Sequence, residues 1–291
     1  MQRRNCSQIG DFGMDSPRQA LGPRNDREAK LFQALDTSGF GLELGPSYRP
    51  AAPRARGFNI EIADHVGTDD LRKKYEKVPG ALENIEDVNY VLTDGLYAGI
   101  RKPERFDFVI ASHVIEHAPD FIQFLTDCER LIKSDGVLSL AVPDKRYCFD
   151  AARPTSTLGN VLRAHREKRT KPDPYDVLDH YLNCVTKNQL FGWHKGYEFE
   201  HETLYTTEVA MHWYGKALAG EYVDIHCWQF TPSTFRLLVS ELCHLGHVGL
   251  RIVTFHNTTD HEFFVSLKKG NEPDFNRPSL LRAAILESAD I

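Results

Sequence analysis

Short apolar runs alternate with helix-like segments along most of this sequence, and this alternation restricts the fold more than any other feature. The runs 106–112 and 136–143 are apolar nearly throughout, as strands buried on both faces of a sheet are. Between them, apolar residues recur at helical spacing from Phe121 to Ile132. Strand–helix–strand units of this kind build a parallel sheet with helices on both faces. The sequence therefore predicts a doubly wound α/β fold.

The remaining predicted elements complete a seven-stranded, mostly parallel sheet. Earlier strands are expected at 39–45, 57–64 and 90–94, and helices at 17–35, 68–77 and 231–245. Thr231 is a good helix cap, and Pro232 suits the first helical position. Two final strands, 248–255 and 262–268, are joined by a short polar link and predict a closing antiparallel hairpin.

The alternation of strands and helices breaks over residues 144–226, a segment rich in Tyr, His, Trp, Arg, Pro and Asn. We interpret this segment as a long insertion after the fifth strand. It separates a core of residues 17–143 from a closing part, residues 227–269, that holds the last helix and the hairpin. Residues 1–16 are expected to form a flexible leader, and residues 270–291 a tail with a linker and one short helix.

The composition argues against several classes of function. Lys and Arg number 35 against 41 Asp and Glu, so the net charge is -6 and no nucleic-acid partner is expected. No stretch reaches the roughly 18 apolar residues of a membrane-spanning helix, and no apolar segment follows the basic start as in a secretory signal. The six cysteines are scattered and never spaced Cys-x-x-Cys, so we expect reduced thiols in a cytoplasmic protein.

Acidic residues follow a glycine turn at the strand ends, where a doubly wound sheet binds its ligand. Gly45 allows the chain to turn sharply after the first strand and to approach a ligand closely. Asp64 follows Gly45 by nineteen positions and ends the second strand, where a carboxylate can accept hydrogen bonds from both hydroxyls of a ribose. Asp94 ends the third strand, where a carboxylate could accept from an adenine amino group. This ordered set predicts a nucleoside-binding edge.

Five segments carry a family resemblance: 42–46 (LELGP), 62–64 (IAD), 93–95 (TDG), 106–117 (FDFVIASHVIEH) and 136–143 (GVLSLAVP). With the closing hairpin, they resemble the class I S-adenosylmethionine-dependent methyltransferases, from about Phe40 to Lys268. That family has a Rossmann-like fold with a seventh, antiparallel strand. A dehydrogenase is disfavoured, because Gly-x-Gly-x-x-Gly is absent after the first strand. The segments 142–150 and 222–228 resemble, more narrowly, bacterial methyltransferases of cell-surface polysaccharide and glycan gene clusters.

The resemblance implies S-adenosylmethionine as the cofactor and gives roles to residues of this chain. By this resemblance, Glu43, Gly45 and Pro46 would border the methionine part of the cofactor. Asp64 would hold the ribose, and Asp94 and Gly95 would hold the adenine. Ser112 and His113 would line the sulfonium and the amino group. The family often has a second glycine where this chain has Ser47. This difference puts in question how closely the loop backbone approaches the cofactor.

The sequence favours methyl transfer to a hydroxyl of a glycan or of another small polar acceptor. His226 is the candidate catalytic base, because an imidazole titrates near neutrality. Asp224 lies two residues earlier, so in an extended segment its carboxylate would point the same way and orient the ring. His113 is the second candidate, and a purely structural His226 beside Trp228 is the alternative.

Other functions and the partners stay open at this point. The insertion 144–226 must leave the sheet at the edge that holds the cofactor, so we expect it to cover the acceptor as a lid. The chain could instead be a natural-product methyltransferase with an aromatic or amine acceptor. It could also be a catalytically silent module that scaffolds a biosynthetic complex. The sequence leaves the oligomeric state open.

The run His113-Val-Ile-Glu-His117 formally matches the His-x-x-Glu-His pattern of some zinc peptidases. Such an enzyme needs the pattern on one helix and a further ligand downstream. Here the run follows a buried strand and precedes Pro119, so at most one helical turn is available. No metal is therefore expected, and Glu116 and His117 are predicted to fix the turn by hydrogen bonds.

Overall fold

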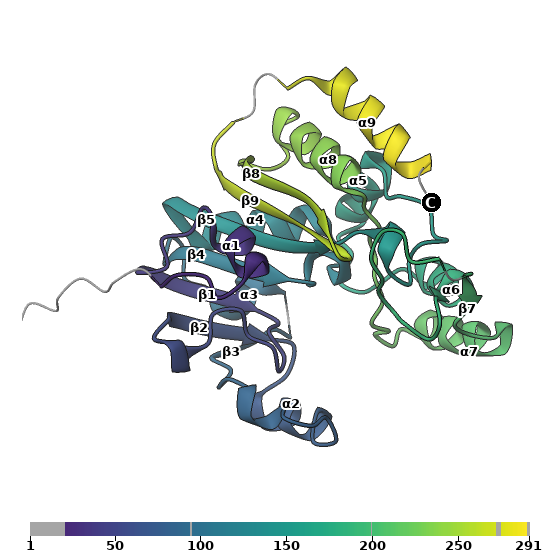
Figure 1. Cartoon of the computed structure of the whole chain (residues 1–291), viewed down its shortest axis with the longest axis horizontal. Coiled ribbons are helices and arrows are strands. Elements are labelled where there is room, and N and C mark those ends of the chain that lie inside the picture. Colours follow the sequence, from purple (N-terminus) through teal and green to yellow (C-terminus); the bar gives the residue numbers. More distant parts are fainter. Residues whose placement is uncertain (1–20, 94, 199, 272–274, 290–291) are drawn as a thin grey trace, which may run out of the picture.

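Seven strands form one sheet in the order β3-β2-β1-β4-β5-β9-β8 (Figure 1) in a computed structural model that describes residues 21–93, 95–198, 200–271 and 275–289. The strands are β1 (Phe40–Leu44), β2 (Asn59–Asp64), β3 (Tyr90–Val91), β4 (Phe106–Ser112), β5 (Ile132–Pro143), β8 (Leu250–Thr259) and β9 (Glu262–Lys269). Strands β1 to β5 pair in parallel, whereas β9 is antiparallel to both β5 and β8. The predicted fold class is confirmed. The chain order reverses between β1 and β4, and the carboxyl ends beside this switch point are where such sheets bind ligands.

Helices cover both faces of the sheet. They are α1 (Asp26–Phe32), α2 (Thr68–Lys74), α3 (Leu96–Ile100), α4 (Phe121–Leu131), α5 (Leu158–Glu167), α6 (Pro174–Asn183), α7 (Thr207–Leu218), α8 (Pro232–His244) and α9 (Arg277–Ala289). Four single turns of 3-10 helix join them: η1 (Arg54–Arg56), η2 (Leu82–Asn84), η3 (Ile115–His117) and η4 (Lys145–Tyr147). None of these described helices has both the length and the apolar character needed to span a bilayer.

The two long core helices begin at side chains that bind the free amides of the first turn. The carboxylate of Asp120 accepts from the Gln123 amide at the start of α4. At the start of α8, Thr231 and Thr234 form a reciprocal capping box and Pro232 occupies the first turn. Such a cap contributes about 1 kcal/mol, and the cap at Thr231 confirms the predicted start of this helix.

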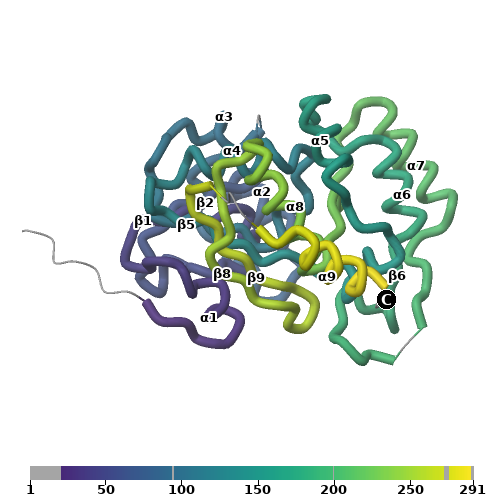
Figure 2. Tube along the Cα trace, turned by 90° about the horizontal axis from the view of Figure 1, so that it is seen from above, coloured from purple at the N-terminus to yellow at the C-terminus, as the bar shows by residue number. Residues whose placement is uncertain are grey.

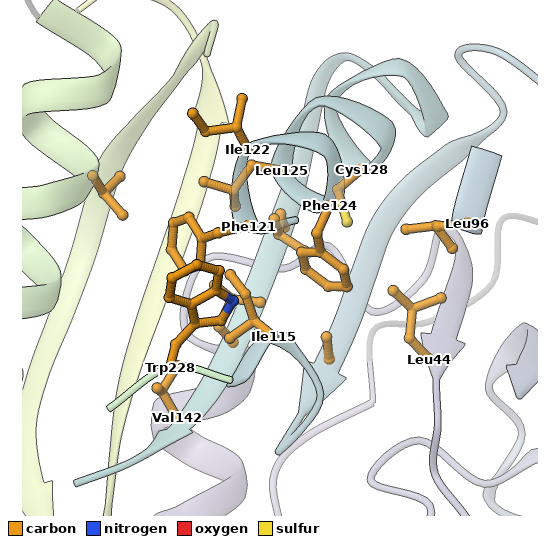
Figure 3. Packing of buried hydrophobic residues seen from close by; sticks show 14 of the residues in the cluster. Leu44, Leu96, Ile115, Phe121, Ile122, Phe124, Leu125, Cys128, Val142 and Trp228 are labelled. Atoms are coloured by element: carbon orange, nitrogen blue, oxygen red, sulfur yellow. The ribbon is translucent and has the colours of Figure 1, made fainter. Parts of the chain in front are cut away.

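A hydrophobic core lies on each face of the sheet, as the apolar runs predict. On one face, Phe121, Leu125 and Trp228 gather between α4 and the strands (Figure 3). On the other face, Leu31 of α1 packs with Phe108 and Ile110 of β4. Successive residues of β4 thus alternate between the two cores, and a strand enclosed in this way holds its carboxyl end in a fixed position.

Three element boundaries differ from those predicted. Strand β5 begins at Ile132, because this residue pairs with Phe106 across a register shift, and the predicted break at 134–136 therefore lies within the strand. The polar link of the hairpin is shorter than predicted, because Asn257 to Thr259 continue β8. Strand β3 has only two residues. In each case, pairing with a neighbouring strand decided the boundary rather than local composition.

Residues 144–226 form helices and a small sheet instead of further βα units. Helices α6 and α7 lie at the end of the molecule away from β1 to β3, as both views show (Figures 1 and 2). A separate two-stranded sheet pairs β6 (Val185–Thr186) with β7 (Glu202–Thr203). Val161 of α5 and Val177 of α6 join the main hydrophobic core, so the segment is anchored to the sheet. The division of the chain into core, insertion and tail stays a prediction, and residues 1–16 lie outside the described part of the chain.

Candidate functional site

The chain turns sharply after β1 at Gly45, beside the carboxyl ends of β2 and β4. Gly45 has a φ of +57°, and its amide donates to the Ala63 carbonyl at 2.8 Å. A Cβ at this position would lie 3.1 Å from Cγ2 of Val114, which follows β4. Both the left-handed conformation and the tight contact favour glycine here. The turn thus leaves room beside the strand ends that a larger residue would fill.

Asp64 lies at the end of β2, directly beside this turn. Its carboxylate is 2 % exposed and accepts from the His65 amide at 2.7 Å and, at 3.4 Å, from the Ser47 amide. A buried acid beside the glycine turn is the arrangement that a ribose-binding site needs. Gly95, which precedes α3, has a φ of +97° and open space around it. Asp94 lies outside the described residues, so its role stays a prediction.

Ser47 adopts a conformation that favours glycine. Its φ is +55°, which is the left-handed region and costs an L residue roughly 1–2 kcal/mol. Glycine would adopt this backbone geometry without that cost. The Ser47 hydroxyl is buried and has no hydrogen-bond partner among the described residues. A buried hydroxyl without a partner, next to Asp64 and Gly45, fits a site that completes its hydrogen bonds with a bound ligand.

Glu43 organises the loop after β1. Its buried carboxylate accepts from the amides of Ala51 and Ala52 at 2.7 and 3.1 Å. Burial raises the pKa of Glu43 to about 7, although the two amides oppose the shift. Both carboxylate oxygens are thus bound to the loop, so Glu43 shapes the border of the predicted cofactor site through the backbone of residues 46–52.

The end of β4 is tied to α1 and β9. The Ser112 hydroxyl accepts from the Arg27 guanidinium at 2.7 Å, and this guanidinium also binds Glu262 at 2.6 Å. The His113 Nε2 lies 3.0 Å from the Glu262 carboxylate. Burial alone would lower the pKa of His113, but Glu262 and the charge of Glu116 reverse this effect and raise it. Because this pairing favours the imidazolium, which has no free lone pair, it disfavours His113 as a proton acceptor.

His226 is oriented by Asp150 and not by Asp224. Its Nδ1 lies 2.6 Å from the Asp150 carboxylate, and both side chains are buried. Asp224 instead accepts from His117 Nδ1 at 2.9 Å and is largely exposed. The predicted Asp224–His226 pair is therefore wrong. The reason is that the amides of Cys227 and Trp228 both donate to the Glu116 carbonyl, so residues 224–228 do not continue as a regular strand.

Asp150 is a site residue that the sequence analysis missed. Burial would raise its pKa, but His226 and Arg153 lower it well below the usual range, so the carboxylate is ionised and acts only as an acceptor. The Nδ1–H of His226 therefore donates to Asp150, and Nε2 is the ring nitrogen that can face a ligand. Asp150 ends the segment 142–150, which the sequence analysis singled out without giving this residue a role.

Glu116 does not fix its turn through its side chain, contrary to the prediction. The residue is fully buried in η3, and neither carboxylate oxygen has a hydrogen-bond partner among the described residues. Glu116, His117 and His226 bring one ligand atom each within 4.8 Å of one another. The two imidazole rings meet edge to face, with centroids 4.7 Å apart. We call these three residues the His–Glu cluster. It lies just beyond β4 and can hold a cation or bind a polar group.

The chain is similar to one protein-family model and to several solved structures. Residues 21–242 match a family model described as "Methyltransferase domain". Among solved structures, a Rhodobacter sphaeroides protein assigned as a Zn-dependent alcohol dehydrogenase is 13 % identical, with 85 % of this chain and 91 % of that chain covered and a TM-score of 0.47. A Listeria monocytogenes protein assigned as an S-adenosylmethionine-dependent methyltransferase is 11 % identical. The match covers 84 % of this chain and 98 % of that chain, with a TM-score of 0.42. The 1,6-didemethyltoxoflavin-N1-methyltransferase of Burkholderia thailandensis is 10 % identical. The match covers 84 % of this chain and 76 % of that chain, with a TM-score of 0.43. No curated protein matches the sequence.

Proposed function

The chain belongs to the methyltransferase domain family and uses S-adenosylmethionine, and from this premise we propose that it methylates a hydroxyl of a glycan or of another small polar acceptor. The cofactor supplies an electrophilic methyl group when bound. The glycan as acceptor is supported by the resemblance of segments 142–150 and 222–228. We also propose a cytoplasmic location, because none of the five described cysteines forms a disulfide.

Four elements hold the cofactor in this proposal. The turn at Gly45 and Pro46 gives the backbone close access, and the loop behind it is fixed by Glu43. Asp64 binds the ribose hydroxyls in place of its present contact with the Ser47 amide. Open space at Gly95 accommodates the adenine, and the end of β4 at Ser112 borders the sulfonium.

The observation that carries the acceptor proposal is the His–Glu cluster next to the end of β4. An acceptor hydroxyl must lose its proton when its oxygen bonds to the methyl carbon, and a positioned group speeds this loss by typically 10²–10⁴-fold. In this proposal His226 accepts the proton at Nε2, because Nδ1 is occupied by Asp150 at 2.6 Å. We assign proton removal to His226 within this cluster. Asp224 takes part through His117, whose Nδ1 it holds.

The insertion 144–226 closes over this edge in our proposal. His226 and Asp150 both stand at the ends of the insertion, so any movement of the insertion shifts the cluster. Trp228 is part of the core and donates its indole N–H to Ala118, so it is not a free platform for a sugar. Trp213, by contrast, stacks on Tyr181 at 5.7 Å with an angle of 11°. These two rings of the insertion are the ones we propose for packing against the acceptor.

Two measurements test this function. Purified protein should bind S-adenosylhomocysteine in calorimetry, and it should transfer labelled methyl from S-adenosylmethionine to glycosides rather than to phenols or amines. His226→Ala should lower turnover about 10²–10⁴-fold while the affinity for S-adenosylhomocysteine changes by only a few-fold. Phenol or amine methylation would favour the natural-product alternative. Cofactor binding without transfer to any acceptor class would favour the silent scaffold.

A further inference from the structure

Glu116 presents a physical problem that no contact in the described protein solves. Its carboxylate is fully buried, and both oxygens lack a hydrogen-bond partner among the described residues. The imidazole nitrogens of His113 and His226 lie 3.6 and 3.9 Å from Oε1, which is beyond hydrogen-bond distance. These two imidazoles are within ion-pair distance, but burying a carboxylate without hydrogen bonds is costly, so native proteins satisfy such groups or use them to bind metal ions.

Two histidines face this carboxylate in the arrangement of metal ligands. His117 and His226 each have Nδ1 bound to a carboxylate, that of Asp224 at 2.9 Å and that of Asp150 at 2.6 Å. Each ring therefore has only Nε2 left for a further ligand. Histidines that bind metal ions almost always donate their other ring N–H in this way, which fixes the tautomer and the ring orientation. Two such histidines beside one free carboxylate make up a complete set of three protein ligands.

We propose that Glu116, His117 and His226 bind a divalent metal ion, with Zn²⁺ preferred. Two histidines and one glutamate are the ligand set of a class of catalytic zinc sites, which keep a fourth position open. The three ligand atoms already lie within 4.8 Å of one another. Bonds of about 2.0–2.2 Å in a tetrahedron place ligand atoms roughly 3.4 Å apart, so small side-chain rotations close the site.

The open fourth position of the ion indicates its role, which is to bind the acceptor; this role rests on the proposed function. His117 is 32 % exposed, so the ion has one accessible side. An acceptor hydroxyl bound there would lose its proton more readily, because a bound Zn²⁺ strongly lowers the pKa of an oxygen ligand, and the proton would pass to solvent water at the exposed side of His117. With the ion bound, His226 would be a ligand through Nε2 and would no longer accept the proton itself. The ion selects acceptors that have an oxygen to coordinate.

A second group of potential ligands nearby is a poorer site. Asp150, His180 and Cys184 also lie within 4.8 Å of one another. However, the buried guanidinium of Arg153 binds Asp150 at 2.8 Å, and its positive charge repels a cation there. The two groups can be told apart, because Cys184 belongs only to the second.

Calorimetric titration of the chelator-stripped full chain with ZnCl₂, without cofactor, tests the site. We expect one Zn²⁺ per chain, at least 100-fold weaker binding in Glu116→Gln and His226→Ala, and unchanged binding in Cys184→Ser. His165→Asn is the matched control, because His165 forms a similar pair with Asp120, at 2.9 Å, outside the cluster. The inference is overturned by absent binding, by equal binding in Glu116→Gln, by loss of binding in Cys184→Ser, or by preference for Mg²⁺ over Zn²⁺.

Thermal unfolding gives a second, independent reading. Zn²⁺ should raise the melting temperature of the wild type and of His165→Asn but not that of Glu116→Gln, since a ligand stabilises only a state that binds it. Metal-free Glu116→Gln should melt close to the metal-free wild type, because the substitution keeps the size of a side chain that makes no hydrogen bond in the described protein. Binding of S-adenosylhomocysteine without Zn²⁺ binding would refute the metal site and leave the methyltransferase function intact. The reverse result would refute the function and keep the site.

Discussion

Asp150→Asn should both destabilise the protein and disable its chemistry, because Asp150 holds two buried groups at once. Its carboxylate binds His226 Nδ1 at 2.6 Å and the Arg153 guanidinium at 2.8 Å. Arg153 also donates to the His226 carbonyl at 2.8 Å, so the three residues join the two ends of the insertion. An amide has one acceptor oxygen for these two donors and carries no charge.

The size of the stability loss follows from the burial of Arg153. Removing one partner of a buried ion pair costs roughly 3–5 kcal/mol, because the other charge stays buried. Arg153 retains Asp179 at 3.2 Å, so we expect about 3 kcal/mol, at the lower end. Asp179→Asn is the matched control. Its carboxylate is 42 % exposed, and an exposed pair contributes about 0–1 kcal/mol.

Urea unfolding followed by circular dichroism measures both variants against the wild type. The amide also turns an N–H toward His226 Nδ1, which favours the tautomer with the proton on Nε2. We therefore expect turnover of Asp150→Asn to fall about 10²–10⁴-fold and Zn²⁺ affinity 10–100-fold, with S-adenosylhomocysteine affinity within a few-fold. Equal stability losses in Asp150→Asn and Asp179→Asn would refute the reasoning, as would unchanged turnover.

The cofactor edge yields three further predictions. Asp64→Ala should weaken the binding of S-adenosylhomocysteine roughly ten- to a hundredfold in calorimetry, since a charge-assisted pair of hydrogen bonds is worth about 1.5–3 kcal/mol. Unchanged binding would remove Asp64 from the ribose site. Gly45→Val should abolish this binding, because its side chain would meet Val114 and strain the turn; an affinity near that of the wild type would contradict the close approach. The folded-state pKa of Glu43 is about 7, above its ordinary value of 4.5, so its contribution to stability is full below pH 4.5 and lost as pH rises through 7. Between pH 5 and 8, urea unfolding should show the free energy of unfolding of the wild type falling by about 2–3 kcal/mol relative to that of Glu43→Gln. Parallel pH profiles of the two proteins would argue against the raised pKa.

The sheet and the strand ends of the candidate cofactor site could be predicted because their signals are local. Strands enclosed on both faces are apolar over a whole run, so β4 and β5 were identifiable without any contact information. Once the strands are placed, their carboxyl ends are placed too, and Gly45 and Asp64 follow from the spacing of turn and acid. The strand boundaries were less predictable, since the pairing of Ile132 with Phe106 depends on the neighbouring strand.

The His–Glu cluster could not be predicted because two segments far apart in the chain build it, and a third segment supplies the Asp150 that orients it. The run His113-Val-Ile-Glu-His117 contains two of the three proposed ligands, but its first histidine binds Glu262 instead. The third ligand, His226, arrives from beyond the insertion, and its partner Asp150 lies at the insertion's other end. Neither position follows from periodicity, because the path of the insertion depends on tertiary packing and not on an alternating pattern. The pairing of Asp224 with His117 has the same cause. The amides of Cys227 and Trp228 both donate to the Glu116 carbonyl, so residues 224–228 lose the two-residue alternation that would have placed Asp224 beside His226.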